Sequence, residues 1–317
     1  MITNKRIFMT GGGGFIGSWL CHTLANNNEI IVYDNSRRDA LSKRDFNGKK
    51  NIRFISGDIL DKEFLKKSIP PVDIVIHLAA IAGVTSYYEI PKKTMEVNII
   101  GTYNLLEAIE DKNVERYIHF STSEVYGSYS FRSREDSNTN QGNISDPRWT
   151  YAISKLSAEK LGYCYYFEKQ IPMVSIRPFN IYGPWQVGEG AIQSFITKAI
   201  NNMDIPITGD GTQIRAWCYI EDLVNAVISC INIEEAVGKT FNIGNPEGTI
   251  TILGLAKKII EITNSKSKIF FKEHIGTDIE LRIPDISKAK KILGYSPKIG
   301  LDEGLSLSID FFKQNPQ

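Results

Sequence analysis

The sequence predicts an α/β fold in which a parallel sheet is covered by helices on both faces, followed by a smaller mixed α/β region. Over the first half of the chain, short runs rich in β-branched residues alternate with longer amphipathic stretches. This alternation is typical of parallel strands joined by helices. The strand candidates are continuous apolar runs, as expected for strands buried on both faces. Beyond Pro184 the pattern becomes less regular, which indicates a second, smaller unit.

The predicted elements follow in chain order. The first part is expected to hold strands at residues 6–10, 29–33, 52–55, 74–78, 117–121 and 173–176, and helices at 15–26, 62–67, 92–110 and 155–169. The second part is expected to hold short strands near Ile207, 217–220 and 240–243, and helices at 222–231, 252–263, 285–293 and 303–313. The stretch 132–143, rich in Ser, Asn and charge, is either a mobile flap or a surface loop.

Composition excludes several classes of protein. The chain has 317 residues and a formal net charge of +1, so no global field favours nucleic acid or an anionic membrane. No run approaches the roughly 18 apolar residues of a transmembrane helix, and the first ten residues resemble a strand entering a turn more than a signal peptide. The four cysteines form no CxxC pair. This spacing favours reduced thiols in the cytoplasm and predicts no metal site.

A glycine-rich turn follows the first predicted strand and opens the first predicted helix. It reads Thr10-Gly11-Gly12-Gly13-Gly14-Phe15-Ile16-Gly17. Glycines at 11, 14 and 17 allow a tight turn, close approach of the backbone to a pyrophosphate, and close contact between helix and strand. The helix N-terminus offers free N–H groups to the phosphates. The strand-turn-helix context predicts a dinucleotide site.

The ends of the next strands supply the remaining cofactor residues. Asp34 ends the second strand, and a carboxylate there accepts hydrogen bonds from ribose hydroxyls and repels a 2′-phosphate, which favours NAD over NADP. Asp58 either hydrogen-bonds the adenine or caps a helix. The predicted cofactor-binding residues are Gly11, Gly14, Phe15, Ile16, Gly17, Asp34, Asn35, Asp58, Ile59, Leu78, Ala79 and Ala80, together with Tyr151 and Lys155.

A hydroxyl, a phenol and an ammonium form the predicted catalytic group. Tyr151 and Lys155 are four residues apart at the start of a helix and share one face of it. Lys155 is expected to hold the nicotinamide ribose and, through its charge, to lower the pKa of Tyr151, so that the phenolate acts as a base. Thr122, after the preceding strand, is expected to hydrogen-bond the same substrate hydroxyl. The base would take the proton as hydride leaves the carbon for NAD.

These residues resemble the extended short-chain dehydrogenase/reductase family, which comprises sugar-nucleotide epimerases, dehydratases and decarboxylases. The resemblance covers nearly the whole chain. It includes the glycine turn, the Thr122 motif and Tyr151/Lys155, and also the segments Asn98-Ile99-Ile100-Gly101-Thr102, Arg177-Pro178-Phe179-Asn180-Ile181-Tyr182-Gly183-Pro184, Gly209-Asp210-Gly211-Thr212-Gln213-Ile214-Arg215 and Tyr219-Ile220-Glu221-Asp222.

The resemblance implies a domain organisation and partners. Residues 1–178 would form a Rossmann domain that holds NAD tightly. Residues 179–317 would mainly bind a nucleoside-diphosphate sugar, with some segments returning to the first domain. Asn180 and Arg215 would lie near the diphosphate, which suits an amide donor and a guanidinium fork. Gln193 either contacts the sugar or lies at a solvent-facing helix start. A homodimer is also expected.

Position 124 helps to divide the branches of the family. Simple 4-epimerases usually carry small or hydroxyl residues after the catalytic Ser/Thr, whereas this chain has Ser123-Glu124, which suggests chemistry at C5 or C6. The resemblance favours UDP-glucuronate decarboxylases, in which the residues matching Ser123, Glu124 and Arg215 surround the C6 carboxylate. The catalytic set is therefore Thr122, Ser123, Glu124, Tyr151 and Lys155. A 4-epimerase, a GDP-mannose-type 4,6-dehydratase and a C4 dehydrogenase remain alternatives, with a non-catalytic NAD sensor a remote one.

Overall fold

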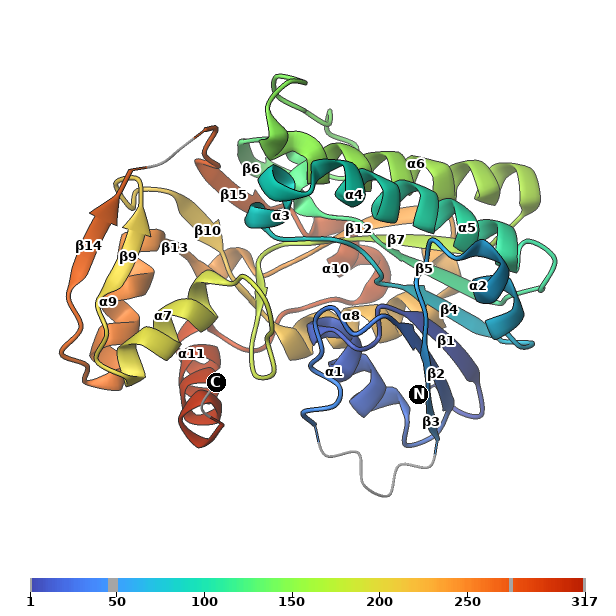
Figure 1. Cartoon of the computed structure of the whole chain (residues 1–317), viewed down its shortest axis with the longest axis horizontal. Coiled ribbons are helices and arrows are strands. Elements are labelled where there is room, and N and C mark those ends of the chain that lie inside the picture. Colours follow the sequence, from blue (N-terminus) through green and yellow to red (C-terminus); the bar gives the residue numbers. More distant parts are fainter. Residues whose placement is uncertain (1, 45–50, 274–275, 316–317) are drawn as a thin grey trace.

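The computed structural model describes residues 2–44, 51–273 and 276–315, and a seven-stranded sheet forms its centre (Figure 1). All neighbouring strands in this sheet are parallel. Their spatial order places β1 between β2 and β4, so the chain switches direction there, as in doubly wound folds. The predicted fold class is confirmed. In spatial order the strands are β12 (Lys239–Ile243), β7 (Met173–Pro178), β5 (Arg116–Phe120), β4 (Ile74–His77), β1 (Arg6–Thr10), β2 (Glu29–Asp34) and β3 (Ile52–Ser56).

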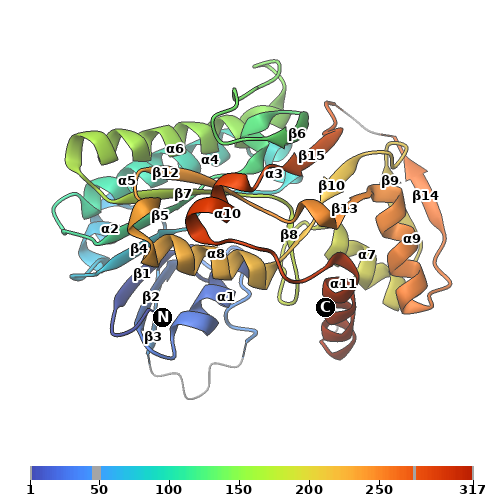
Figure 2. The ribbon, with the colours of Figure 1, turned by 180° about the vertical axis from the view of Figure 1, so that it is seen from behind.

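Helices cover both faces of this sheet, because successive residues of its strands point to opposite sides. Ile7 and Met9 of β1 join one apolar core, while Phe8 between them joins the other. Figures 1 and 2 show the two helical layers. The layer on one face contains α1 (Phe15–Leu24) and α8 (Ile220–Asn232), and the layer on the other contains α2 (Lys62–Ser68), α4 (Pro91–Met95), α5 (Gly101–Ile109) and α6 (Thr150–Lys169).

The helix expected at residues 92–110 contains a π-helical turn in its middle. This turn, η1 (Glu96–Ile100), separates α4 from α5 and carries Asn98, which is 1% exposed. The Asn98 amide nitrogen donates to Ser154 Oγ of α6 at 2.9 Å, and its oxygen accepts from the Ile81 N–H at 2.8 Å. Asn98 therefore joins the segment after β4 to the helix that carries Tyr151.

The second half of the chain forms smaller sheets at one end of the large sheet (Figure 1). A four-stranded mixed sheet has the order β13-β10-β15-β6, so a strand from the middle of the chain pairs with one near its C-terminus. Its strands are β13 (Thr249–Thr251), β10 (Ile214–Ala216), β15 (Leu281–Pro284) and β6 (Tyr129–Ser133); two parallel pairs are β8 (Ile181–Tyr182) with β11 (Cys218–Tyr219) and β9 (Ile205–Thr208) with β14 (Ile269–Lys272). The remaining helices are α3 (Val84–Glu89), α7 (Ala191–Ile200), α9 (Ile252–Thr263), α10 (Ser287–Leu293) and α11 (Leu301–Gln314), with short 3₁₀ turns at η2 (Ser123–Tyr126), η3 (Pro147–Trp149), η4 (Glu234–Ala236) and η5 (Pro246–Gly248).

The stretch 132–143 is held against the protein. The Asn140 N–H donates to Val125 O at 3.1 Å, and the Gln141 amide donates to the same oxygen at 2.9 Å. Glu135 accepts from the Asn242 N–H at 2.8 Å. Of the two interpretations offered by the sequence, these bonds favour the surface loop.

A buried ion pair fixes α6 to the strands beneath it. Glu159 is 2% exposed, and its carboxylate accepts two 3.0 Å hydrogen bonds from Arg177 of β7. Ser121 Oγ, directly after β5, donates at 2.6 Å, and Thr240 Oγ of β12 donates at 2.8 Å. Despite burial, which opposes the charge, Glu159 and Tyr126 raise the pKa of Arg177. One carboxylate therefore connects α6 to three strands of the sheet.

Replacing Glu159→Gln is expected to lower the free energy of unfolding by about 3 kcal/mol or more, because it leaves the buried Arg177 charge unpaired. Urea unfolding followed by circular dichroism measures the change. The matched control is Asp302→Asn, which breaks the exposed Lys258–Asp302 pair and should cost less than about 1 kcal/mol. Equal losses in the two variants would contradict the role given to Glu159.

Candidate active site

The predicted hydroxyl, phenol and ammonium meet where β5 ends and α6 begins. Thr122 precedes η2 and accepts from the Glu124 N–H at 3.2 Å. Tyr151, the second residue of α6, hydrogen-bonds the Thr122 hydroxyl. Lys155 follows one turn later and is 2% exposed, and Ser123 on η2 is also buried. The fold therefore brings Thr122 and Tyr151 into contact across 29 positions of chain.

Burial controls the protonation of these groups in the ligand-free protein. It lowers the pKa of Lys155 to about 8, opposed by the nearby Glu159 charge. It also raises the pKa of Tyr151, helped by the Glu124 charge and opposed by the hydrogen bond with Thr122. Burial therefore dominates the pKa of Tyr151 in the ligand-free protein, and the expected effect of the Lys155 charge on Tyr151 stays a prediction.

A cluster of charges, which we call the Glu124 cluster, lies beside Tyr151. It comprises Glu124, Arg148, Arg215 and Arg282. Arg148 donates to both Glu124 carboxylate oxygens, at 2.7 and 3.2 Å, and Arg282 donates to one at 3.4 Å. The side chains of these three residues are 15%, 7% and 5% exposed, in the order Glu124, Arg148, Arg282. Burial opposes the Glu124 charge, but the two guanidinium groups hold its pKa below the ordinary value.

Arg215, which the resemblance places with Ser123 and Glu124 around a C6 carboxylate, bonds to backbone carbonyls in the ligand-free protein. Arg215 of β10 donates to the backbone carbonyls of Ile214 and Ile279, at 2.9 and 2.6 Å. Burial, with the charges of Arg282 and Arg148, lowers its pKa to about 10. Contact with Glu124 comes from Arg148 and Arg282 instead. The reason is topological, since β15 pairs with both β10 and β6 and brings Arg282 to η2.

The other two predicted substrate residues lie on the second half of the chain. Asn180 follows β7 with a positive φ of 42°, and its amide nitrogen donates to Ala216 O at 3.0 Å. Gln193 is 9% exposed on α7, so it is buried and not a solvent-facing helix start. Their contact with a sugar nucleotide stays a prediction.

A cavity of about 440 Å³ opens at the carboxyl ends of β1, β2 and β4. In doubly wound sheets, ligands bind at this edge, next to the switch point. Further residues outside the predicted cofactor set line it, among them Arg38, Lys93 and Glu189. Of the predicted cofactor residues, those that line it are Gly11, Gly14, Phe15, Ile16, Gly17, Asp34, Asn35, Asp58, Ile59, Leu78, Ala79 and Ala80.

The glycines of the turn fit a bound dinucleotide. A Cβ on Gly11 would lie 2.4 Å from Ala79 N, and one on Gly17 would lie 2.5 Å from Gly12 Cα, so packing requires both glycines. A Cβ on Gly14 would meet only Gly11 O at 3.5 Å and Arg38 O at 4.0 Å. Space is therefore open beside Gly14, where α1 begins without a side-chain cap. Free N–H groups in such a position suit a pyrophosphate.

The two carboxylates at the edge of the cavity have different local roles. Asp34 accepts from the Gly13 N–H at 2.9 Å and from the Ser36 N–H at 2.7 Å. Burial raises the pKa of Asp34, although these bonds oppose the shift. Asp58 accepts from the Leu60 N–H at 2.9 Å, whereas Asp61 caps α2. Asp58 is therefore not the helix cap, and it faces the cavity.

Residues 185–190, which follow Gly183-Pro184, extend along the cofactor cavity. Gln186, Val187 and Glu189 line it. Glu189 accepts from the Thr85 N–H at 3.2 Å and lies 3.9 Å from Arg38. The segment after Pro184 therefore forms part of the wall of the cofactor cavity.

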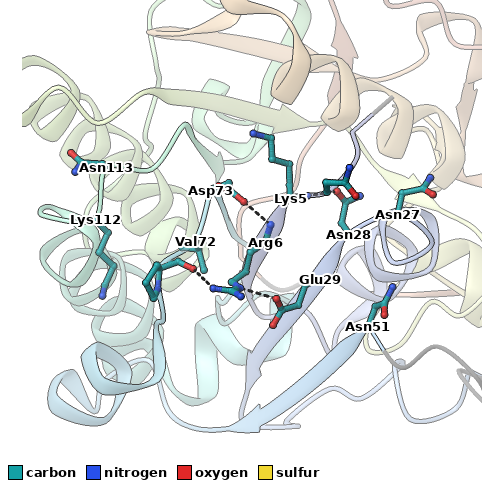
Figure 3. A pocket seen from close by; sticks show the side chains of 12 residues that line it. Lys5, Arg6, Asn27, Asn28, Glu29, Asn51, Val72, Asp73, Lys112 and Asn113 are labelled. Atoms are coloured by element: carbon teal, nitrogen blue, oxygen red, sulfur yellow. Dashed lines mark hydrogen bonds and ion pairs between the residues drawn. The ribbon is translucent and has the colours of Figure 1, made fainter.

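A second cavity lies at the opposite edge of the sheet (Figure 3). It has a volume of about 620 Å³ and surrounds the amino ends of β1 and β2. Of its charged lining residues, Arg6 pairs with Glu29 and Lys5 pairs with Glu115 outside the lining, each at 2.7 Å. Parallel sheets rarely bind ligands at this edge. Across residues 2–44, 51–273 and 276–315, no group of His, Cys, Asp or Glu has the arrangement of a metal site, and no helix is long and apolar enough to span a membrane.

Three side chains beside Tyr151 were not selected from the sequence. Arg148 lies three residues before Tyr151, and its position one turn away was the available signal. Tyr87 of α3 stacks on Tyr151 with ring centroids 5.3 Å apart. Arg282 comes from β15. The last two arrive from other elements, so spacing within one helix could not reveal them.

The surroundings of Gly14 and Gly17 predict that the same substitution will weaken NAD binding at one position and stability at the other. Gly14→Ala should leave the thermal unfolding temperature nearly unchanged but lower NAD affinity at least about tenfold, because the added methyl enters the cofactor space. Gly17→Ala should destabilise the ligand-free fold, because its methyl meets backbone. Calorimetric NAD titration and thermal unfolding separate the effects. Unchanged NAD affinity in Gly14→Ala would contradict the placement.

The pKa of Lys155 predicts a stability cost that depends on pH. Its folded pKa of about 8 lies below its ordinary 10.5, so the cost is complete below pH 8 and vanishes as the pH rises to 10.5. Lys155→Met should therefore stabilise the ligand-free protein by about 3 kcal/mol at pH 7, and less at each higher pH. Urea unfolding between pH 7 and 10.5 measures this, with exposed Lys160→Met as control. A constant difference across the series would contradict the assignment.

Comparison with known proteins agrees with this geometry. Residues 7–244 match the NAD dependent epimerase/dehydratase family. The chain is 35% identical to a UDP-N-acetyl-alpha-D-glucosaminuronate decarboxylase of Bacillus cytotoxicus, covering 98% of both chains. It is also 35% identical to UDP-glucuronic acid decarboxylase 6 of Arabidopsis thaliana, covering 98% of this chain and 90% of the relative.

Solved structures show the same likeness. UDP-glucuronic acid 4-epimerase from Bacillus cereus, in complex with UDP-glucuronic acid and NAD, superposes with a TM-score of 0.89 at 32% identity, covering 98% of this chain and 99% of the other. The resemblance inferred from the sequence is thereby confirmed. The chain is an enzyme of the NAD dependent epimerase/dehydratase family.

Proposed function

We propose that this enzyme uses NAD to oxidise C4 of a UDP-linked hexuronic acid and then releases the C6 carboxylate as carbon dioxide. The observation that carries the proposal is the Glu124 cluster. It holds three guanidinium groups and one carboxylate in a buried site beside Tyr151, and this excess of positive charge favours an anionic substituent on the sugar.

Arg282 offers a specific donor for this anionic substituent. Its Nε is buried and has no hydrogen-bond partner among the residues that the structure describes. Burial lowers the pKa of Arg282, and the charges of Glu124 and Arg148 act on it in opposite senses. A buried N–H without a partner costs stability that a ligand oxygen would recover. A substrate carboxylate held by Arg282, with its sugar facing Tyr151, supplies that oxygen.

The first chemical step belongs to Thr122, Tyr151 and Lys155. Thr122 and Tyr151 would hydrogen-bond the C4 hydroxyl, and Tyr151 would accept its proton as hydride leaves C4. NAD, when bound in the cavity beside Gly14, supplies the hydride acceptor and a positive charge that favours the phenolate. Lys155, with a pKa of about 8, is mostly protonated at neutral pH and holds the ribose.

The second step follows from the ketone at C4. The substrate is then a β-keto acid, so the C5–C6 electron pair can move toward the ketone as carbon dioxide leaves, and a proton returns to C5. Glu124 is ionised and bonded to two arginines, so we assign it the task of orienting these guanidinium groups and not that of an acid. The sequence suggested that Glu124 is linked to chemistry at C5 or C6; in this proposal its part in that chemistry is indirect.

The architecture supports further proposals for the whole chain. We assign residues 1–178 to the NAD-binding domain and 179–317 mainly to the sugar nucleotide, with β12 lying in the large sheet. We also propose a homodimer through α5 and α6, which lie side by side (Figure 1); Tyr103 and Phe167 on these helices are exposed, as is Ile100 at the end of η1. Four cysteines without disulfides suit the cytoplasm.

Mass spectrometry of the purified enzyme with NAD and a panel of UDP-sugars tests the function. We expect loss of carbon dioxide from UDP-glucuronate or UDP-N-acetylglucosaminuronate, and no turnover of UDP-glucose or UDP-N-acetylglucosamine. Arg282→Gln should retain NAD but decarboxylate at least about a hundredfold more slowly, because a preorganised donor to the carboxylate is lost.

The controls separate this function from its alternatives. Arg134→Gln removes an exposed guanidinium far more accessible than Arg282, with a side chain 68% exposed, and should leave turnover unchanged. Loss of water would assign a dehydratase, and a new chromatographic peak of unchanged mass would assign a 4-epimerase. Full activity of Arg282→Gln on a uronate would contradict the role of the Glu124 cluster.

A further inference from the structure

Tyr87 makes an unusual set of contacts for a buried aromatic residue. Its ring lies parallel to that of Tyr151, with centroids 5.3 Å apart and an interplanar angle of 8°. The Arg148 guanidinium lies over the Tyr87 ring, 5.5 Å from its centroid. The Tyr87 hydroxyl accepts from the Gly83 N–H at 3.2 Å. Tyr87 therefore contacts both the proposed base and the Glu124 cluster.

Core packing does not account for this position. Tyr87 is 3% exposed, yet the two large apolar cores of the described residues are built from other side chains. Tyr87 instead contacts a phenol and a guanidinium. Parallel aromatic rings and cations over rings are both specific geometries with directional preferences.

We propose that Tyr87 is a positioning residue that fixes the plane of the Tyr151 ring and couples it to the Glu124 cluster through Arg148. The inference rests on the proposed function, because it treats Tyr151 as the base. Tyr151 has two side-chain torsions, and its hydrogen bond with Thr122 restrains only the hydroxyl end. A stacked ring removes the remaining freedom of the ring plane.

Arg148 extends this restraint to the substrate side. It donates to both Glu124 oxygens, and a guanidinium held in this way has a fixed plane. The Tyr87 ring is then in contact with two groups, the Arg148 guanidinium and the Tyr151 ring. The carboxylate of the substrate and its C4 hydroxyl would thus meet groups held in one rigid arrangement, which favours a reactive geometry.

The stack can be tested in the ligand-free protein, independently of the substrate. With 3,5-difluorotyrosine incorporated at position 151, slow ring flips give two ¹⁹F signals and fast flips give one. We expect two signals in the native chain and in Tyr87→Phe, which keeps the ring, and one averaged signal in Tyr87→Leu. Two signals in Tyr87→Leu would overturn the proposal.

Kinetics then tests the consequence, with the UDP-sugar that the native enzyme converts. Tyr87→Leu should lower kcat about tenfold, with KM changed less than about twofold and with NAD content and unfolding temperature retained, while Tyr87→Phe keeps native kcat. A Tyr87→Phe variant as slow as Tyr87→Leu would assign the effect to the hydroxyl and overturn the proposal. So would parallel loss of NAD and stability, which marks a purely structural role. If the native enzyme converts no UDP-uronate, the proposed function fails while the ¹⁹F result still decides the stack.

Discussion

The bond network of Glu159 is the constraint on which the active-site geometry depends. This carboxylate lies one turn after Lys155 on α6, and it accepts hydrogen bonds from Arg177 of β7 and from Ser121, the neighbour of Thr122. The same residue therefore fixes the helix that carries Tyr151 and Lys155 and the strand end that carries Thr122. Because removing one partner of a buried pair is costly, α6 cannot slide along the sheet without breaking these bonds.

The Glu124 cluster follows a different principle. Glu159 is fully paired within the protein, whereas Glu124 shares its single charge among guanidinium groups that outnumber it. Burying excess positive charge costs free energy unless an anion completes the set. The large apolar cores stabilise the surrounding fold, so the protein tolerates the free-energy cost of this buried positive charge. The unfavourable free energy of this excess charge is relieved when an anionic ligand binds, and the relief adds to the affinity for that ligand.

The sequence predicted what depends on local patterns and missed what depends on distant ones. β1 and α9 were located at their observed bounds because apolar runs and periodicity lie within each segment. The short strands β6, β10, β14 and β15 were missed, since each has few residues and depends on partners far along the chain. The same reason explains why Arg282 and Tyr87 went unnoticed. The glycine turn could be predicted because the close backbone approach at Gly11 requires glycine there, and this requirement is visible within one short segment.

The fold is shared by relatives named as decarboxylases and by solved structures named as 4-epimerases, so the fold alone does not choose between the two outcomes. Both reactions can begin with oxidation at C4. The β-keto acid then loses carbon dioxide only when the C5–C6 bond stands roughly perpendicular to the plane of the ketone, because only then do its electrons enter the carbonyl system. In the proposed mechanism, guanidinium groups that bind the carboxylate would restrain this torsion, and Glu124 holds two of these guanidinium groups in place. Under this proposal, the orientation of the C5–C6 bond decides between decarboxylation and epimerisation, and Glu124 sets that orientation through the arginines without exchanging a proton with the substrate.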